Sequence, residues 1–594
     1  MYLAKLTISN FRKFKEATFE FIPGLNVIVG ANNIGKTAVV DALRSLLAGH
    51  EEPYPRFSSD DIHRPVNGDL PTGDITFNFV FKGLSVDDEA DFLAALVPID
   101  NGNDEKFEAR LGLTISTVSA TDRIKIRKWC GQHQDIAITS DMLDNLRGVY
   151  LKPLRDASLG LRPGKNSQMA RLMRLMGEND DNGKQSIETL VKRFETLLKR
   201  RSPFVATDNA ISGRHNQMLG ETLSQELELD FSGNDFRSLS SKIALSTDGM
   251  DVDTNGLGFN NLIFMAVVLS EMVRDPTAAY RGLVIEEPEA HLHPQLQVVL
   301  LDYLKQIKSE EGEGDVQLFV TSHSPNFASL ADLSSITCLI ENDHFIKVYS
   351  PRNAKFDENA KQHKKKVKKL ERYLDVTKAE LYFARRIIFV EGSAELMLVN
   401  ELAKRAEIPF DLRKQAVSIL SVEGLNFDCF LPLFGEKALP ISISVITDAD
   451  PAREVIEGNT VQKYPDLDES VEISANTKKI KKDFEDDFVK VFYGKKTLEY
   501  DLALYDVNRK LMLEALTELH PRIAKDISTA VDAAETNTDK AKLLFTGMFE
   551  RGENKTNVKK GEFAQELAYL LKEDNTDFIV PEYISAAVKH VCVG

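Results

Sequence analysis

Short apolar runs, most of them followed by a polar turn and a helical period, recur along the chain. Continuous runs of this kind predict strands that are buried on both faces of a parallel sheet, with helices packed against them. The sequence therefore predicts an α/β protein. The clearest runs end at or beside Gly30, Ile285, Thr321, Val390 and Thr447.

A helical pattern without such runs fills residues 157–230. Apolar residues recur there at helical spacing from Met169 to Met176 and again from Ile187 to Leu198, which predicts two helices. Two interpretations stay open: the helices pack on their own domain, or they form a dimerisation insertion. They are too short for a long coiled-coil arm.

Composition places the chain among folded globular proteins. Of its 594 residues, 43% are hydrophobic and 28% are charged, and a chain of this length divides into two or three domains. The net charge of -17 excludes a surface that is basic throughout, although a local groove could still bind a phosphate backbone. The four cysteines are far apart and indicate neither a zinc site nor a disulfide framework.

The sequence predicts no targeting or membrane segment. No apolar run approaches the roughly 18 to 20 residues of a membrane span, and the N-terminus MYLAKLTISNFRKF lacks the apolar core of a signal peptide. We therefore expect a cytoplasmic protein with no membrane partner.

The first motif that carries chemistry is GANNIGKT, which fits G-x-x-x-x-G-K-[ST] between a predicted strand and a predicted helix. In such a P-loop, backbone amides cradle phosphates, Lys36 reaches the β- and γ-phosphates, and the Thr37 hydroxyl ligates Mg²⁺. The sequence therefore predicts an ATP site. Its residues are Gly30, Asn32, Asn33, Gly35, Lys36 and Thr37.

Two later runs supply side chains that suit the same site. Glu286 and Glu287 end the run in RGLVIEEPEAHLHP, so we predict that Glu286 holds Mg²⁺ and that Glu287 orients or deprotonates the attacking water. His323 ends the run in VQLFVTSHS, where a third strand of the same sheet would deliver it to the γ-phosphate.

A glycine-spaced turn at Gly256 and Gly258 opens a long apolar helix, and such a helix N-terminus suits an anion. The order of P-loop, glycine turn, EEPEAHLHP and TSHS resembles the ABC-type ATPase heads of DNA-repair and chromosome-maintenance proteins. This resemblance implies a dimer in which each glycine turn caps the ATP of the other subunit. It also places RFSSDDIH in the loop that senses Mg²⁺ and nucleotide, with Asp60 or Asp61 in place of the usual glutamine.

A basic segment at residues 351–375 has KQHKKKVKKLER at its centre. Two interpretations stay open for it. The lysines could form the solvated face of a helix, or they could form a phosphate-binding stripe beside an active site, in which case nucleic-acid binding would depend strongly on salt.

A second acidic site is predicted after this segment. IIFVEGSAE reads as a buried strand that ends in Glu391, a tight turn at Gly392 and a helix with Glu395 in its first turn. LPISISVITDAD ends in Asp448 and Asp450, which would point to one side of an extended strand. Four carboxylates at strand ends of one sheet repel one another unless cations are present, so the sequence predicts a Mg²⁺ or Mn²⁺ site.

The pattern VEGxxE followed by DxD resembles the TOPRIM domain of topoisomerases, primases and certain nucleases. With the preceding head, the whole chain resembles the OLD (overcoming lysogenization defect) family of ATPase-nucleases, and SVEGLNF, KKTLEYDLA and KKGEFAQELA also resemble OLD segments. The resemblance implies that Lys560 steadies the charge on a scissile phosphate. It also implies one or two divalent ions held by Glu391, Glu395, Asp448, Asp450 and Glu499.

We therefore predict an ABC-type ATPase head with a helical insertion, followed by a Rossmann-like TOPRIM domain. The head comprises residues 1–156 and 231–350, the helical insertion 157–230, the basic linker 351–375 and the TOPRIM nuclease domain 376–594.

The leading functional hypothesis is an ATP-regulated, metal-dependent endonuclease that nicks or cleaves DNA, and the family resemblance implies a role in anti-phage defence. It also implies a homodimer or higher oligomer and leaves room for a helicase-like or other defence-operon partner. Two alternatives stay open: a ribonuclease that uses the same acidic site, and a nucleotide-dependent DNA clamp or sensor without nuclease activity. A topoisomerase-like strand passer is a further hypothesis that the sequence does not favour. The strand passer would need an active tyrosine in a separate DNA-cradling module, for which the sequence leaves no room.

Overall fold

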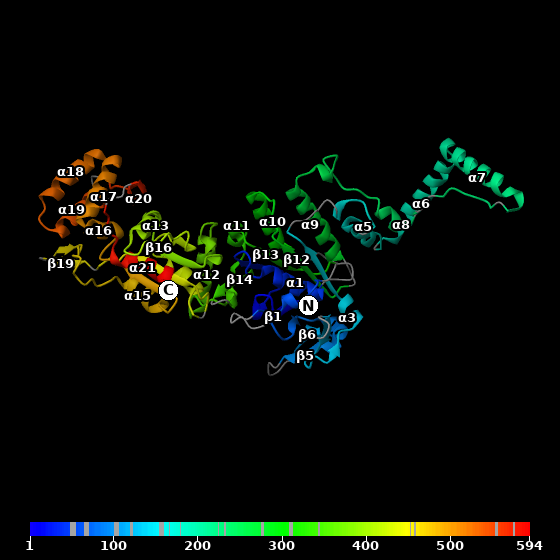
Figure 1. Ribbon diagram of the computed structural model, residues 1–594, viewed down its shortest axis with the longest axis horizontal. Coiled ribbons are helices and arrows are strands. Elements are labelled where there is room, and N and C mark those ends of the chain that lie inside the picture. Colours follow the sequence, from blue (N-terminus) through cyan, green and yellow to red (C-terminus); the bar gives the residue numbers. More distant parts are fainter. Residues whose placement is uncertain are drawn as a thin grey trace.

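The protein is elongated in the computed structural model, with the acidic C-terminal domain at one end, a two-sheet head in the middle and a pair of helices projecting at the other end (Figure 1). The model describes residues 1–47, 55–64, 71–99, 106–118, 123–153, 160–165, 167–178, 180–223, 225–230, 233, 235–274, 278–307, 313–342, 345–436, 438–451, 453–456, 459–552, 556–573 and 577–593.

The centre of the head is a six-stranded sheet in which only the outer β14–β15 pair is antiparallel. Every residue of β3 and β13 is buried, as expected for strands covered on both faces. The parallel strands end at one edge, so the P-loop and the acidic run meet there. In spatial order the strands are β15 (Phe345–Tyr349), β14 (Ile336–Asn342), β3 (Leu25–Gly30), β13 (Gln317–Ser322), β12 (Tyr280–Glu286) and β9 (Leu146–Leu151).

A second, antiparallel sheet packs against the first through helix α1 (Lys36–Leu47). Phenylalanines alternate inward along its strands and, with the buried face of α1, form one core. Its strands are β2 (Phe14–Glu20), β1 (Tyr2–Phe11), β4 (Ile75–Lys82), β6 (Lys106–Val118), β7 (Arg123–Cys130) and β8 (Ile136–Ala137), with β5 (Leu96–Ile99) paired to β6.

Three helices cover the other face of the parallel sheet: α9 (Leu257–Arg274), α10 (Pro294–Gln306) and α11 (Pro325–Leu330). The expectation that no segment could span a membrane needs a correction, because α9 has the length and apolar composition for it. In the protein α9 is a core helix, with residues such as Met265, Val268 and Met272 buried against the sheet.

Three helices, rather than the two predicted, lie between residues 168 and 223: α5 (Gln168–Glu178), α6 (Asp181–Lys199) and α7 (Ser202–Leu223). Helix α5 packs on α9 and on α8 (Phe236–Ser240), whereas α6 and α7 project away from the head (Figure 1). The boundaries predicted at residues 156/157 and 230/231 fall at or beside residues outside the described ranges.

The C-terminal domain is built on a four-stranded parallel sheet in the order β17 (Val417–Ser421), β16 (Arg386–Val390), β18 (Ser442–Thr447) and β21 (Val489–Tyr493). Helices α13 (Ser393–Arg405), α15 (Ala475–Phe484) and α21 (Glu582–Val593) flank it. A helical layer covers the carboxyl edge and consists of α16 (Leu498–Ala503), α17 (Asp506–Leu519), α18 (Pro521–Ala533), α19 (Asn537–Phe549) and α20 (Lys560–Glu573).

The predicted basic linker contains a packed helix, α12 (Ala360–Tyr373). Leu370 and Leu374 join one continuous apolar core that also holds Leu25 of the head and Phe389 of the C-terminal sheet. The two domains are therefore connected by packed structure, and the predicted α/β class is confirmed in both.

Candidate active sites

The P-loop joins β3 to α1 in a conformation that only small residues allow. Gly30 has a φ of +157°, and a Cβ there would lie 2.8 Å from the carbonyl oxygen of Leu339 on the neighbouring strand. Asn33, with a φ of 60°, is exposed, as are Asn32 and Thr37. The loop therefore leaves its tip open to a phosphate ligand.

Lys36 is buried and folds back onto this loop. Its Nζ donates to the carbonyl oxygens of Gly30 at 2.7 Å and Ala31 at 2.9 Å. Burial lowers the pKa of Lys36, while the charges of Glu287 and Glu289 act against that shift. The amine is thus held at the loop, next to the place where phosphate would bind.

Glu286 ends β12 and lies in a buried network beside the P-loop helix. Burial raises its pKa to about 7, with further contributions from the nearby charges of Asp41 and Glu287, while a hydrogen bond from Tyr150 works in the opposite direction. Arg44 of α1 lies over the ring of Tyr150 at 4.0 Å. A divalent cation would stabilise the charged form of this buried carboxylate. The position of Glu286 therefore fits the predicted Mg²⁺ site.

Glu287 and His323 are brought together as the sequence predicted. Glu287 has a left-handed φ of 44°, and its backbone N–H donates to the carbonyl oxygen of Thr321 at 2.9 Å. His323 Nδ1 lies 3.3 Å from Glu287 Oε1. Backbone strain of this kind is concentrated at functional sites.

Glu289 is a third carboxylate of this site and was missed from the sequence. It is buried, and its Oε1 accepts hydrogen bonds from the Ser322 hydroxyl at 2.7 Å and from the His323 N–H at 3.2 Å. The only sequence signal was its position two residues after Glu287. Glu289 therefore positions the segment that carries His323.

The glycine turn lies against the acidic loop of its own chain. A Cβ on Gly258 would meet the carbonyl oxygen of His291 at 2.6 Å, so this contact requires glycine. Gly256 faces open space, and Leu257 and Phe259 are 58% and 54% exposed. The turn thus presents an uncovered surface at the start of α9.

Asp61, rather than Asp60, is the carboxylate of RFSSDDIH that connects to the P-loop helix. Arg12 Nε donates to Asp61 Oδ1 at 2.7 Å, and Arg12 Nη1 donates to Asp41 Oδ2 at 2.8 Å. Asp60 is exposed and pairs with Arg64. The network links this loop to α1.

The second acidic site forms where β16 and β18 end. Glu391 Oε1 accepts hydrogen bonds from the Asp448 N–H at 2.9 Å and from the Thr447 hydroxyl. Glu395 caps the first turn of α13 by accepting the N–H of Gly392 at 3.0 Å. The two strand ends and the helix start therefore bring these carboxylates together, and we call this cluster the acidic crevice.

Glu499 and Lys560 join this crevice from the helical layer. Lys560 Nζ donates to Glu499 Oε2 at 2.8 Å, and the Thr497 hydroxyl donates to the same oxygen at 3.0 Å. Glu499 is fully buried, and its Oε1 has no hydrogen-bond partner among the described residues. Residues from separate parts of the chain are thus brought together.

One part of the geometric prediction is wrong. Strand β18 ends at Thr447, so Asp448 and Asp450 are not on an extended strand, and Asp450 has a left-handed φ of 40°. The turn leaves Asp448 half-buried and Asp450 exposed. Asp450 is still close enough for its charge to raise the pKa of Glu391.

The carboxylates of the crevice destabilise one another's charged forms. Burial raises the pKa of Asp448, and the charges of Glu391, Glu499 and Glu395 raise it further. The pKa of Lys560 is raised, because Glu499 and the other carboxylates outweigh the effect of burial. The single positive charge of Lys560 is therefore surrounded by several carboxylates and does not balance their negative charge.

The residues of the crevice fit a divalent metal. Within the described ranges, no three histidine, cysteine or acidic side chains are already arranged to hold a metal ion. However, the donors are hard carboxylate oxygens that repel one another, and the buried Oε1 of Glu499 lacks a hydrogen bond. A divalent cation would remove both sources of instability.

Asp501 is a further residue that the sequence did not reveal. Its two oxygens accept the N–H groups of Lys495 at 2.9 Å and Lys496 at 3.0 Å, and burial raises its pKa to about 7. It therefore fixes the loop that leads from β21 to Glu499.

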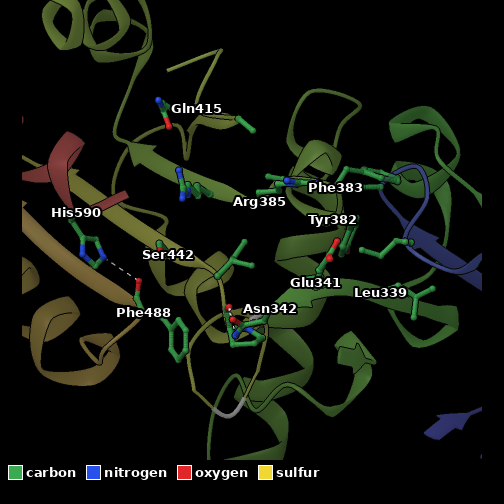
Figure 2. Close-up of a pocket in the computed structure, with 18 of the residues that line it drawn as sticks. Leu339, Glu341, Asn342, Tyr382, Phe383, Arg385, Gln415, Ser442, Phe488 and His590 are labelled. Carbon is green, nitrogen blue, oxygen red and sulfur yellow. Dashed lines mark hydrogen bonds between the residues drawn. The ribbon is translucent and has the colours of Figure 1, made fainter. Parts of the chain in front are cut away.

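A cleft of about 660 Å³ lies between the head and the C-terminal domain (Figure 2). On the head side it is lined by Ala31, the residue that accepts from Lys36, and by Asn342. On the other side it is lined by the amino ends of the C-terminal strands, including Arg386 and Ser442. The second acidic site lies at the opposite edge of that sheet.

Three protein families match the chain. Residues 5–129 match the family described as AAA domain, residues 119–328 match AAA ATPase domain, and residues 382–450 match Overcoming lysogenization defect protein-like, TOPRIM domain. The last range contains Glu391, Glu395, Asp448 and Asp450.

Among relatives, the chain is 26% identical to an OLD nuclease of Thermus scotoductus, over 75% of this chain and 82% of that protein. It is 21% identical to Endonuclease GajA of Bacillus cereus, over 99% of this chain and 98% of that protein. A solved Smc head, bound to the C-winged helix domain of ScpA, is 18% identical and covers 59% of this chain and 97% of its own, with a TM-score of 0.35.

The OLD-type TOPRIM match falls on the acidic crevice, and the ATPase matches fall on the two-sheet head that carries the P-loop. The similarity to Endonuclease GajA of Bacillus cereus extends over nearly the whole of both chains. The chain therefore combines AAA ATPase-type domains with an OLD-like TOPRIM domain, is homologous to an OLD nuclease and to Endonuclease GajA, and has the use of nucleotide and divalent metal that these domains imply.

Proposed function

We propose that this protein is an ATP-hydrolysing, divalent-metal-dependent DNA endonuclease. The observation that carries the proposal is the crevice in which Glu391, Asp448 and Glu499 lie together with Lys560. Its relatives include an OLD nuclease and an endonuclease, which supports nuclease chemistry at this place. The family resemblance further supports a role in anti-phage defence.

The chain's own residues have distinct tasks in this proposal. Glu391, Glu395, Asp448, Asp450 and Glu499 would hold one or two ions, and the all-oxygen donor set favours Mg²⁺ or Mn²⁺. When bound, such an ion activates the attacking water and stabilises the leaving oxygen. Lys560, held by Glu499 at 2.8 Å, places a positive charge where the scissile phosphate would become more negative.

In the head, the proposed ATP site uses Lys36 for the phosphates, with Thr37 and Glu286 for Mg²⁺. Glu287 would orient or deprotonate the attacking water, with His323 beside it at 3.3 Å. Gly256 and Gly258 would cap the nucleotide of a second subunit. Gly256 faces open space, which supports this role, whereas Gly258 packs against His291 of its own chain.

The experiment that tests the function uses supercoiled plasmid, purified protein, and Mg²⁺ or Mn²⁺, with and without ATP. We expect nicked or linear DNA with either metal and none in EDTA, because the crevice cannot offset its own charge without a cation. Gel electrophoresis of the plasmid gives the answer. A protein that retains plasmid without cutting it would support the clamp or sensor alternative, and cleavage of RNA alone would support a ribonuclease.

We also expect at least a homodimer, and α6 offers a surface for it. Leu190, Phe194 and Leu197 lie at helical spacing on one face of α6 and are 61%, 59% and 54% exposed. A second copy of the same helix would cover this face. Replacing all three by glutamate should shift the oligomer toward monomer in sedimentation velocity.

The matched control replaces Gln185, Lys192 and Thr196, which are exposed on the opposite side of the same helix, by alanine and leaves the apolar face intact. A wild-type protein that stays monomeric at every concentration, with and without ATP, would contradict the dimer. An unchanged dimer in the glutamate variant would show that the subunits meet elsewhere.

A further inference from the structure

Helix α12 carries a face that is basic along its whole length. Lys361, Lys364, Lys365, Lys368 and Arg372 are all exposed, and their spacing places them on one side of the helix. We call these five residues the basic face of α12. Glu371 is the single acidic residue within Ala360–Tyr373.

The opposite side of α12 holds the helix in place. Leu370 is fully buried in the core that joins the two domains. Lys366 is the lysine that forms ion pairs, with Asp357 at 3.3 Å and Asp428 at 3.8 Å. The helix is therefore a fixed support, and the direction of its basic face is set by packing.

The C-terminal end of α12 adjoins the edge of the TOPRIM sheet where the carboxylates lie. Asn426 Nδ2 donates to the Tyr373 hydroxyl at 3.3 Å. In the same loop, the N–H of Gly424 donates to the carbonyl oxygen of Glu391 at 2.8 Å. Two hydrogen bonds and one short loop thus connect the end of the helix to a proposed metal ligand.

The charges of the basic face are not offset within the described part of the chain. None of its five residues forms an ion pair there. Lys361 with Lys365, Lys364 with Lys368, and Lys368 with Arg372 are like-charge pairs at i, i+4, which destabilise a helix. An ordinary solvated helix face mixes both signs, so this arrangement favours a polyanionic partner.

We propose that the basic face of α12 binds the phosphate backbone of duplex DNA and guides the duplex to the TOPRIM crevice. This inference rests on the proposed DNA endonuclease function. The face is about 16 Å long at about 1.5 Å per residue, which corresponds to about five base pairs at about 3.4 Å each. On a protein with a net charge of -17, such a concentrated basic face supplies the attraction that the rest of the surface lacks.

The test compares the wild type with a variant in which Lys361, Lys364, Lys365 and Lys368 are replaced by glutamine. Binding of a 30-base-pair DNA is measured by fluorescence anisotropy over a series of salt concentrations, without divalent metal so that no DNA is cut. Four lost phosphate contacts should reduce the slope of log K against log salt by about 3 to 4. We also expect binding at about 0.1 M salt to weaken more than tenfold.

The matched control removes four exposed positive charges from the helical layer of the C-terminal domain. These are Lys510, Arg522, Lys525 and Lys572. An equal loss of slope in this control, or an unchanged slope in the α12 variant, would overturn the proposal. Tighter binding of an RNA duplex of the same length through these lysines would overturn the assignment to DNA.

Plasmid cleavage is measured separately on the same proteins. A wild type that shows the expected slope but cuts no DNA with any metal would contradict the proposed nuclease function and still support DNA binding by α12. A wild type that cuts DNA, with no change of slope in the α12 variant, would support the nuclease function and contradict DNA binding by α12.

Discussion

Replacing Glu391 by glutamine, or Asp450 by asparagine, should reduce metal-dependent DNA cleavage by about 100- to 1000-fold, because each change removes an interaction that strengthens as charge develops on the phosphate. The rate of plasmid nicking with Mg²⁺ and with Mn²⁺ measures the effect. ATP hydrolysis should stay near the wild-type rate, since the crevice and the P-loop belong to different domains.

Two comparisons separate lost chemistry from lost folding. Asp450 is exposed, so its variant should fold normally, and the control Glu407→Gln removes an exposed carboxylate of the same domain away from the crevice. In EDTA, Glu391→Gln should not lower the melting temperature, because the change removes one of several charges that repel one another. Undiminished cleavage by a folded double variant would show that the chemistry lies elsewhere.

The parts of both sites that follow strands could be predicted from the sequence. Buried apolar runs ending in Gly30, Glu286 and Val390 show where parallel strands end, and parallel strands deliver their last residues to one edge. That rule is local in sequence and needs no knowledge of packing. It placed Glu391 correctly relative to the residues that follow β18.

The residues that the strand rule misplaced or missed depend on turns and on tertiary contacts. Strand β18 ends at Thr447, and Asp450 itself has a left-handed backbone conformation. No alternating pattern of apolar and polar residues reveals this turn. Glu289 acts through hydrogen bonds to Ser322 and His323, more than 30 residues later in the chain. The packing of α12 into the shared core was hidden because its lysines outnumber its apolar residues.

Replacing Glu287 by glutamine should reduce ATP hydrolysis by about 100- to 1000-fold while ATP still binds. Glutamine keeps the length of the side chain and its contact with His323, which lies 3.3 Å away, but it cannot accept a proton from the attacking water. Phosphate release measures hydrolysis, and a fluorescent ATP analogue measures binding. Lys36→Ala should instead weaken binding, because Lys36 is the buried amine held at the phosphate loop.

The contrast between these two head variants is the decisive result, because a general loss of folding would lower binding and hydrolysis together. Asp302→Asn, an exposed change on α10, serves as the matched control and should leave both unchanged. DNA cleavage by Glu287→Gln should still require metal and still depend on Glu391. Hydrolysis of ATP by Glu287→Gln at the wild-type rate would show that Glu287 does not activate the attacking water and that another residue of the head does.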